Sequence, residues 1–141
     1  GSSAYWAHVG DSRAYWLREG AIVERTRDHS HVELLLRAGR ITEQQAQDHP
    51  MRNYVESCIG GEPVLPEMSL GGRRNLQPGD VLMLCSDGLW SGLTDEQISS
   101  LSTCPEGDFR ETLAELGDRA VHATAPFADN TTAAALRWKG P

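Results

Sequence analysis

Three aspartates stand at turns beside short apolar runs, and these residues are the ones best suited to chemistry. Asp87 follows the continuous apolar run 81–85, while Asp11 and Asp129 lie in Gly10-Asp11-Ser12 and Asp129-Asn130-Thr131. Each turn taken alone is typical of an ordinary β-turn, in which aspartate is favoured. A carboxylate at the end of a buried strand is costly unless its charge is compensated. If the three turns converge, they form a carboxylate cluster that requires cations.

Four kinds of chemistry are compatible with the residue types. A carboxylate–metal centre with few histidines favours Mg²⁺ or Mn²⁺ over zinc. A serine hydrolase would need a Gly-x-Ser-x-Gly elbow, which the sequence lacks. A Cys85 nucleophile is disfavoured because an apolar strand raises a thiol pKa. A nucleotide site is weakly supported, because Gly60-Gly61 lacks the lysine and spacing of a P-loop.

The histidines are interpreted as structural residues. Asp28-His29-Ser30-His31 contains ligand-type side chains, but adjacent residues of a strand or helix cannot all face one ion. We therefore expect this segment to serve as a helix cap and loop. His8 has no second histidine at metal spacing, so we expect it in the core or at a sheet edge.

Charge, hydropathy and cysteine content limit the classes of protein and of binding partner that fit this sequence. The 141 residues suit one domain, and 13 Lys+Arg against 20 Asp+Glu give a formal charge of −7. This balance argues against nucleic acid or an anionic membrane as partner, because both require a basic surface. No run approaches the roughly 20 apolar residues of a membrane span, and no signal peptide is visible. Three cysteines without a CxxC argue against a disulfide scaffold or zinc site, and predict a cytoplasmic protein.

The strands that must position the aspartates are predicted from apolar patterning. Segments 4–9, 13–18 and 21–24 have hairpin-type spacing and predict a meander of three antiparallel strands. Further strands are expected at 67–70, 81–85 and 133–136. Residues 73–75 are predicted as a polar turn, 60–63 as a flexible break, and 53–59 as a short helix or extended segment.

Four helices are predicted from apolar periodicity and capping residues. The first covers 30–38, with Ser30 and Glu33 in a capping box, and the second begins at Thr42 and ends before His49-Pro50. A third begins at Thr94 and ends before Cys104-Pro105. The longest is expected at 108–125, where apolar residues form one stripe.

A set of ordered motifs resembles the metal-dependent (type 2C, PPM) protein serine/threonine phosphatases of bacteria. The most specific are Val9-Gly10-Asp11-Ser12-Arg13, the block Ser86-Asp87-Gly88-Leu89-Trp90, and the closing Asp129-Asn130-Thr131-Thr132. Weaker matches occur, in the family's order, at 26–30, 39–42, 49–53, 59–60 and 76–80. Each motif alone is weak, but the ordered set covers nearly the whole chain.

The resemblance implies an α+β fold, in which an antiparallel β-sandwich is flanked by helices (α-β-β-α), present here as its C-terminal portion. It implies two Mg²⁺ or Mn²⁺ ions, with Asp87 and Asp129 binding one of them and Asp11 near a third, weaker ion. Ser86 and Asn130 would orient these ligands. Residues of about 29–61 would form the flap beside the active site. The implied reaction is hydrolysis of phosphoserine and phosphothreonine by a metal-activated water, with phosphoproteins as substrates and a serine/threonine kinase as counterpart.

The sequence also departs from the family. Its phosphate-binding arginine, its metal-bridging Asp-Gly-x-Gly-Gly-His block and the histidine of that block are missing, so no catalytic residue is identified in this chain. The resemblance therefore covers only the C-terminal part of a phosphatase, and the chain alone is expected to show little activity. The alternative is a non-catalytic phosphatase-like module that binds or regulates a partner. Retention of Asp11, Asp87 and Asp129 favours the enzyme.

Overall fold

A four-stranded antiparallel sheet forms the centre of the computed structural model, which describes residues 2–60 and 65–141. The strand order is β4-β3-β7-β8. β3 and β4 form a hairpin through Glu19 and Gly20, which both have positive φ, as a tight hairpin turn requires. The strands are β3 (Arg13–Arg18), β4 (Ala21–Arg25), β7 (Val81–Cys85) and β8 (Ala133–Arg137).

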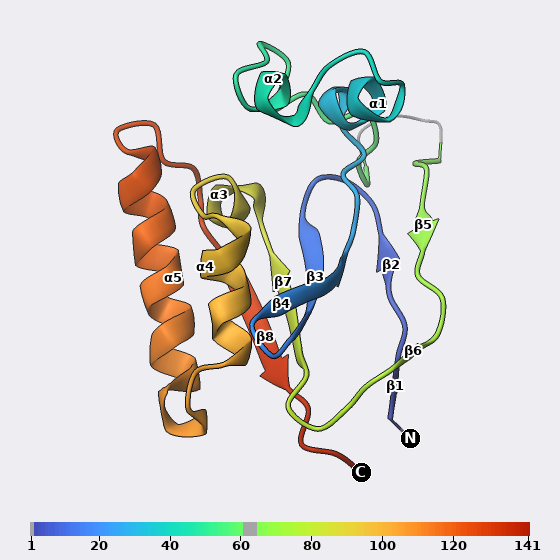
Figure 1. Ribbon diagram of the computed structural model, residues 1–141. Coiled ribbons are helices and arrows are strands. Elements are labelled where there is room, and N and C mark those ends of the chain that lie inside the picture. Colours follow the sequence, from blue (N-terminus) through green and yellow to red (C-terminus); the bar gives the residue numbers. More distant parts are fainter. Residues whose placement is uncertain (1, 61–64) are drawn as a thin grey trace.

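Helices cover one face of this sheet (Figure 1). α5 is the longest, and it buries Leu116 and Ala120 against the core. On β7 the alternation of a half-buried strand puts Val81, Met83 and Cys85 into the same core, while Leu84 is exposed. The helical elements on this side are α3 (Asp87–Trp90), α4 (Asp95–Ser99), η1 (Ser100–Ser102), η2 (Glu106–Asp108) and α5 (Phe109–Thr124).

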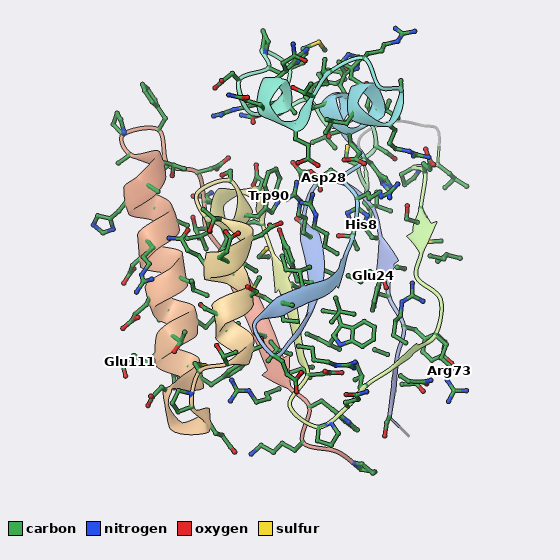
Figure 2. The ribbon with its side chains drawn as sticks, viewed as in Figure 1. His8, Glu24, Asp28, Arg73, Trp90 and Glu111 are labelled. Atoms are coloured by element: carbon green, nitrogen blue, oxygen red, sulfur yellow. The ribbon has the colours of Figure 1, made fainter. Side chains whose placement is uncertain are left out.

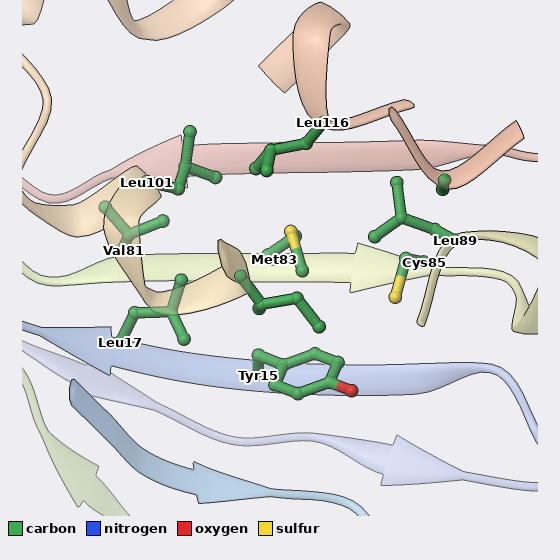
Figure 3. Close-up of a cluster of buried hydrophobic side chains, with 10 residues drawn as sticks. Tyr15, Leu17, Val81, Met83, Cys85, Leu89, Leu101 and Leu116 are labelled. Atoms are coloured by element: carbon green, nitrogen blue, oxygen red, sulfur yellow. The ribbon is translucent and has the colours of Figure 1, made fainter. Parts of the chain in front are cut away.

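The core between the helices and the sheet is apolar and tightly filled. Figure 3 shows Tyr15 and Leu17 of β3 beside Met83 of β7. Each of these three side chains is at most 2% exposed. The core therefore fixes β3 and β7, the two central strands, side by side.

Two small ladders lie on the side of the sheet away from α4 and α5 (Figure 1). β1 (Ser3–Ala4) pairs with β6 (Arg74–Asn75), and β2 (Ala7–His8) pairs with β5 (Ser69–Leu70). The layers, helices on a main sheet with ladders behind it, agree with the expected C-terminal portion of an α-β-β-α fold. His8 is buried, as expected, and is 9% exposed.

Two local predictions were wrong. Residues 4–9 do not form the first strand of a meander, because the chain is divided between β1 and β2, and neither pairs with β3. The predicted polar turn at 73–75 contains β6. Segment 53–59, predicted as a short helix or an extended segment, contains no helix and forms one β-bridge, from Val55 to Ser30. The predicted break at 60–63 falls largely outside the described residues.

The four helix predictions were confirmed, except that the third is α-helical only to Ser99 and continues as the 3-10 helix η1. α1 (His31–Arg37) and α2 (Glu43–Gln47) begin after Ser30 and Thr42. Thr42 forms a full capping box with Gln45. At Ser30, the side-chain half of the predicted box is described, in which the Glu33 amide donates to Ser30 Oγ. Within the described part of the chain, no helix has both the length and the hydropathy for crossing a bilayer.

Candidate functional site

Strand register brings the three predicted aspartates to one end of the main sheet. Arg13, the first residue of β3, lies opposite Cys85, the last of β7, and Cys85 lies opposite Ala133, the first of β8. Asp11 and Asp129 therefore precede this row, and Asp87 follows it. We call this the carboxylate end of the sheet. Antiparallel pairing thus brings three turns that are far apart along the chain to the same end of the sheet, as the sequence analysis considered.

Asp87 begins α3 and is partly buried. Its Oδ1 accepts a hydrogen bond from the Gly88 amide at 2.9 Å. Burial raises the pKa of Asp87, and the negative charges of Asp11 and Asp129 raise that pKa further.

Ser86 joins the turn of Asp87 to the turn of Asp129. Its hydroxyl donates to the Asn130 carbonyl at 3.0 Å and accepts from the Thr132 amide at 3.0 Å. The Ser86 amide also donates to the Thr132 carbonyl at 3.0 Å. Asp129 is exposed, and its Oδ1 accepts from the Asn130 amide at 2.6 Å. Ser86 and the Asn130 backbone therefore fix the position of one turn against the other.

Gly88 allows these two turns to approach closely. A Cβ atom on Gly88 would lie 2.6 Å from the Asn130 carbonyl oxygen and 3.0 Å from Thr131 Oγ1. A glycine at such a position serves either a backbone conformation with positive φ or the close approach of another segment. Because Gly88 lies within α3 and is not among the residues with positive φ, close approach is the reason that applies.

The Asp11 turn is held by residues that the sequence did not indicate as functional. Trp90 donates its indole N–H to the Asp11 carbonyl at 2.9 Å, and Arg13 forms an ion pair with Asp28. Asp28 had been interpreted as part of a cap and loop. Figure 2 shows Asp28 and Trp90 at the end of the sheet that faces α1 and α2. The sequence offered one signal for a role of Arg13 and Trp90, namely that they belong to the same motifs as Asp11 and Asp87.

The donor chemistry at the carboxylate end suits a hard divalent cation. Carboxylate oxygens are the ligands that Mg²⁺ and Mn²⁺ prefer, and the raised pKa of Asp87 reflects negative charge that a cation would compensate. Within the described residues, however, no three His, Cys, Asp or Glu side chains are grouped so that they could hold a metal by themselves. The residues therefore fit part of a metal site, and further ligands are needed to complete one.

Other chemistries find less support in the structure. Burial raises the pKa of the Cys85 thiol to about 12, as the apolar strand predicted, so the thiolate is scarce at neutral pH. The Ser86 hydroxyl donates to a backbone carbonyl and not to a histidine. His29 bonds the Gly10 amide and Ser69, and His31 bonds Glu56, which agrees with structural roles for this segment.

Comparison with known proteins identifies relatives of one kind. No family model matches the chain. A putative protein phosphatase 2C-type protein of Streptococcus pyogenes is 43% identical over 101 residues, which are 71% of this chain and 40% of that protein. The serine/threonine protein phosphatase PstP of Mycobacterium tuberculosis is 36% identical over 125 residues, which are 89% of this chain and 23% of that protein.

Two solved structures that resemble this chain are also serine/threonine phosphatases. The Streptococcus agalactiae serine/threonine phosphatase superposes with a TM-score of 0.87 at 35% identity, covering 99% of this chain and 55% of that one. The catalytic domain of PstP in complex with two manganese ions has a TM-score of 0.74 at 32% identity, covering 94% of this chain and 52% of that one. The chain thus spans about half or less of the proteins it matches.

Proposed function

The chain is related to the C-terminal part of the bacterial metal-dependent (type 2C, PPM) serine/threonine phosphatases, and on this basis we propose that the complete natural protein hydrolyses phosphoserine and phosphothreonine in proteins. The observation that carries the proposal is the placement of the Asp11, Asp87 and Asp129 turns at one end of the sheet. Their arrangement supplies oxygen ligands without a nucleophile, which suits hydrolysis that needs no covalent intermediate.

In this proposal Asp87 and Asp129 bind one Mg²⁺ or Mn²⁺ ion, and Asp11 lies near a further one. The ions would supply an activated water and would neutralise phosphoryl oxygens. Ser86 and Asn130 hold the two liganding turns together through the hydrogen bond from Ser86 Oγ to the Asn130 carbonyl. The manganese complex of the PstP catalytic domain supports this choice of metal.

The segment of about 29–61 is proposed to act as a flap beside the active site. α1 and α2 lie beyond the end of the main sheet, apart from α4 and α5 (Figure 1). The His29 amide donates to the Gly10 carbonyl at 2.8 Å, and Gly10 precedes Asp11 directly. The segment therefore starts beside the candidate site, where it would affect the access of a phosphoprotein. A serine/threonine kinase that phosphorylates the same targets is the counterpart we propose.

The first experiment compares Asp87→Asn with the unmodified complete protein. We expect Mn²⁺ affinity, measured by calorimetry, and Mn²⁺-dependent hydrolysis of p-nitrophenyl phosphate both to fall by at least about tenfold. Because burial and neighbouring negative charges disfavour the charged form of Asp87, the variant should fold at least as stably without metal. Unchanged Mn²⁺ binding and turnover in a folded variant would contradict the proposed site.

A non-catalytic, phosphatase-like module is the second candidate. The observation in its favour is that the described residues contain no group of three side chains able to hold a metal. It predicts that the complete protein binds a partner protein but neither binds Mn²⁺ nor hydrolyses p-nitrophenyl phosphate. Turnover that depends on Mn²⁺ would exclude it.

A further inference from the structure

Arg13 is fixed from two sides next to the candidate site. Its Nε and Nη2 donate to Asp28 Oδ1 and Oδ2 at 2.8 and 2.7 Å, in the bidentate geometry that suits a guanidinium and a carboxylate. Its Cζ lies 3.5 Å from the centre of the Trp90 ring, which is close stacking of a cation on an aromatic face. The Arg13 and Asp28 side chains are only 14% and 8% exposed. Both are therefore held in one geometry.

Trp90 connects this stack to both candidate ligand turns. It is the last residue of α3, the short helix that begins with Asp87. Its indole N–H donates to the backbone carbonyl of Asp11 at 2.9 Å. A displacement of Trp90 would therefore move the Asp11 turn relative to Asp87.

The Asp11 turn needs such an anchor because no strand pairing defines it. β2 ends at His8 and β3 begins at Arg13, so residues 9–12 lie between ladders. Gly10 has a φ of 98°, a conformation that side-chain-bearing residues rarely adopt. Besides Trp90, the turn is held at Gly10 by the backbone and ring of His29.

We propose that Trp90, Arg13 and Asp28 form a positioning unit that fixes the Asp11 turn opposite Asp87. Asp28 orients Arg13, the Arg13 guanidinium supports the Trp90 ring, and Trp90 holds the Asp11 carbonyl by its N–H. In this proposal the three residues are positioning residues, which act through the backbone of Asp11. As far as metal affinity is concerned, this inference rests on the proposed phosphatase function.

The test replaces Trp90 by Phe in the complete protein, which keeps an aromatic face for Arg13 and removes the N–H donor to Asp11. Trp138→Phe is the matched control, because Trp138 lies beyond the opposite end of β8 and its indole N–H has no hydrogen-bond partner within the described residues. In metal-free protein we expect faster hydrogen exchange of a peptide covering 9–13 in Trp90→Phe only. We also expect about a tenfold weaker Mn²⁺ affinity in Trp90→Phe only.

A further readout separates positioning from general destabilisation. The Mn²⁺ concentration for half-maximal turnover should rise while KM for p-nitrophenyl phosphate stays unchanged, and Trp90→His, which retains a ring N–H, should recover part of the Mn²⁺ affinity. Unchanged exchange in 9–13 overturns the positioning unit. Faster exchange with unaltered Mn²⁺ affinity overturns its connection to the metal. Faster exchange in a protein whose parent binds no Mn²⁺ supports the positioning of the turn and overturns the proposed function.

Discussion

Gly88 leaves no space for a side chain at the candidate site. The atoms that a Cβ would meet at 2.6 and 3.0 Å include the backbone carbonyl group of Asn130, which cannot rotate away as a side chain could. We predict that Gly88→Ala lowers the free energy of unfolding by about 1–3 kcal/mol, since overpacking must displace the Asp129 turn. Urea unfolding of the metal-free protein measures this change.

Gly117→Ala is the control for that prediction. Gly117 lies inside α5, and nothing lies within 4 Å of a Cβ placed on it. Alanine there should raise the free energy of unfolding by roughly 0.5–1 kcal/mol, because glycine is a poor helix former. A Gly88→Ala variant as stable as Gly117→Ala would show that the two turns separate without cost.

Only some of the residues at the candidate site could be predicted from the sequence. Asp11, Asp87 and Asp129 were indicated by local signals, namely a turn motif beside an apolar run. Arg13 and Trp90 carry no such signal, because Arg13 meets Asp28 15 residues away and Trp90 meets Asp11 79 residues away. Which charged side chain finds which partner is decided by the fold.

At the scale of elements, the same kind of helix cap should contribute differently to global stability in α2 and α4. Thr94 and Thr42 both form capping boxes, but α4 buries Ile98 in the core, whereas no described residue of α2 is buried. We predict that Thr94→Ala lowers the free energy of global unfolding by about 1 kcal/mol. Thr42→Ala should leave global unfolding unchanged and speed hydrogen exchange only within α2. Equal global losses in both variants would mean that α2 is part of the cooperative core.

Elements were predictable where their signals are local. Helix starts at Ser30, Thr42 and Thr94 follow from capping residues, and Val81–Cys85 follows from a continuous apolar run. The partners of the short strands were not predictable. Alternation in a short segment indicates a strand, but pairing of Ser3 with Asn75 depends on the course of the intervening chain. For the same reason the first strand was wrongly joined to β3.

At the scale of the whole molecule, the two ends of the sheet differ in electrostatic character. The carboxylate end collects negative charge, which disfavours the ionised form of Asp87. At the opposite end, buried Asp80 accepts from Arg18 at 2.6 and 2.8 Å and from the Gln77 amide at 2.8 Å. The Trp138 amide also donates to the Asp80 carbonyl at 2.7 Å. Asp80 thus joins β3, β7 and the segment after β8, and stabilises the sheet away from the site.

The Asp80 cluster should make stability depend on pH in the acid range. Burial alone would raise the pKa of Asp80, but the hydrogen bonds from Arg18 and from the Gln77 amide outweigh it and hold that pKa below its usual value. A carboxyl whose pKa is lowered by folding stabilises the protein above its unfolded-state pKa, near 4, and this stabilisation is lost as pH falls through the lower folded-state pKa. The cluster is therefore fully stabilising at neutral pH.

We predict that Asp80→Asn lowers the free energy of unfolding by about 2 kcal/mol near neutral pH, because hydrogen bonds to a charged group are lost. Urea unfolding should show a smaller difference from the parent as pH falls below the unfolded-state pKa of about 4. If Asp80→Asn lowers the free energy of unfolding equally at neutral pH and below the unfolded-state pKa, the effect is due to packing and not to charge. Because Asp80 lies at the end of the sheet opposite Asp87, Mn²⁺ affinity of the folded variant should match that of the parent. A matching affinity would mean that the carboxylate end keeps its geometry when stability is lost elsewhere, and a lower one would mean that the sheet transmits the change along its strands.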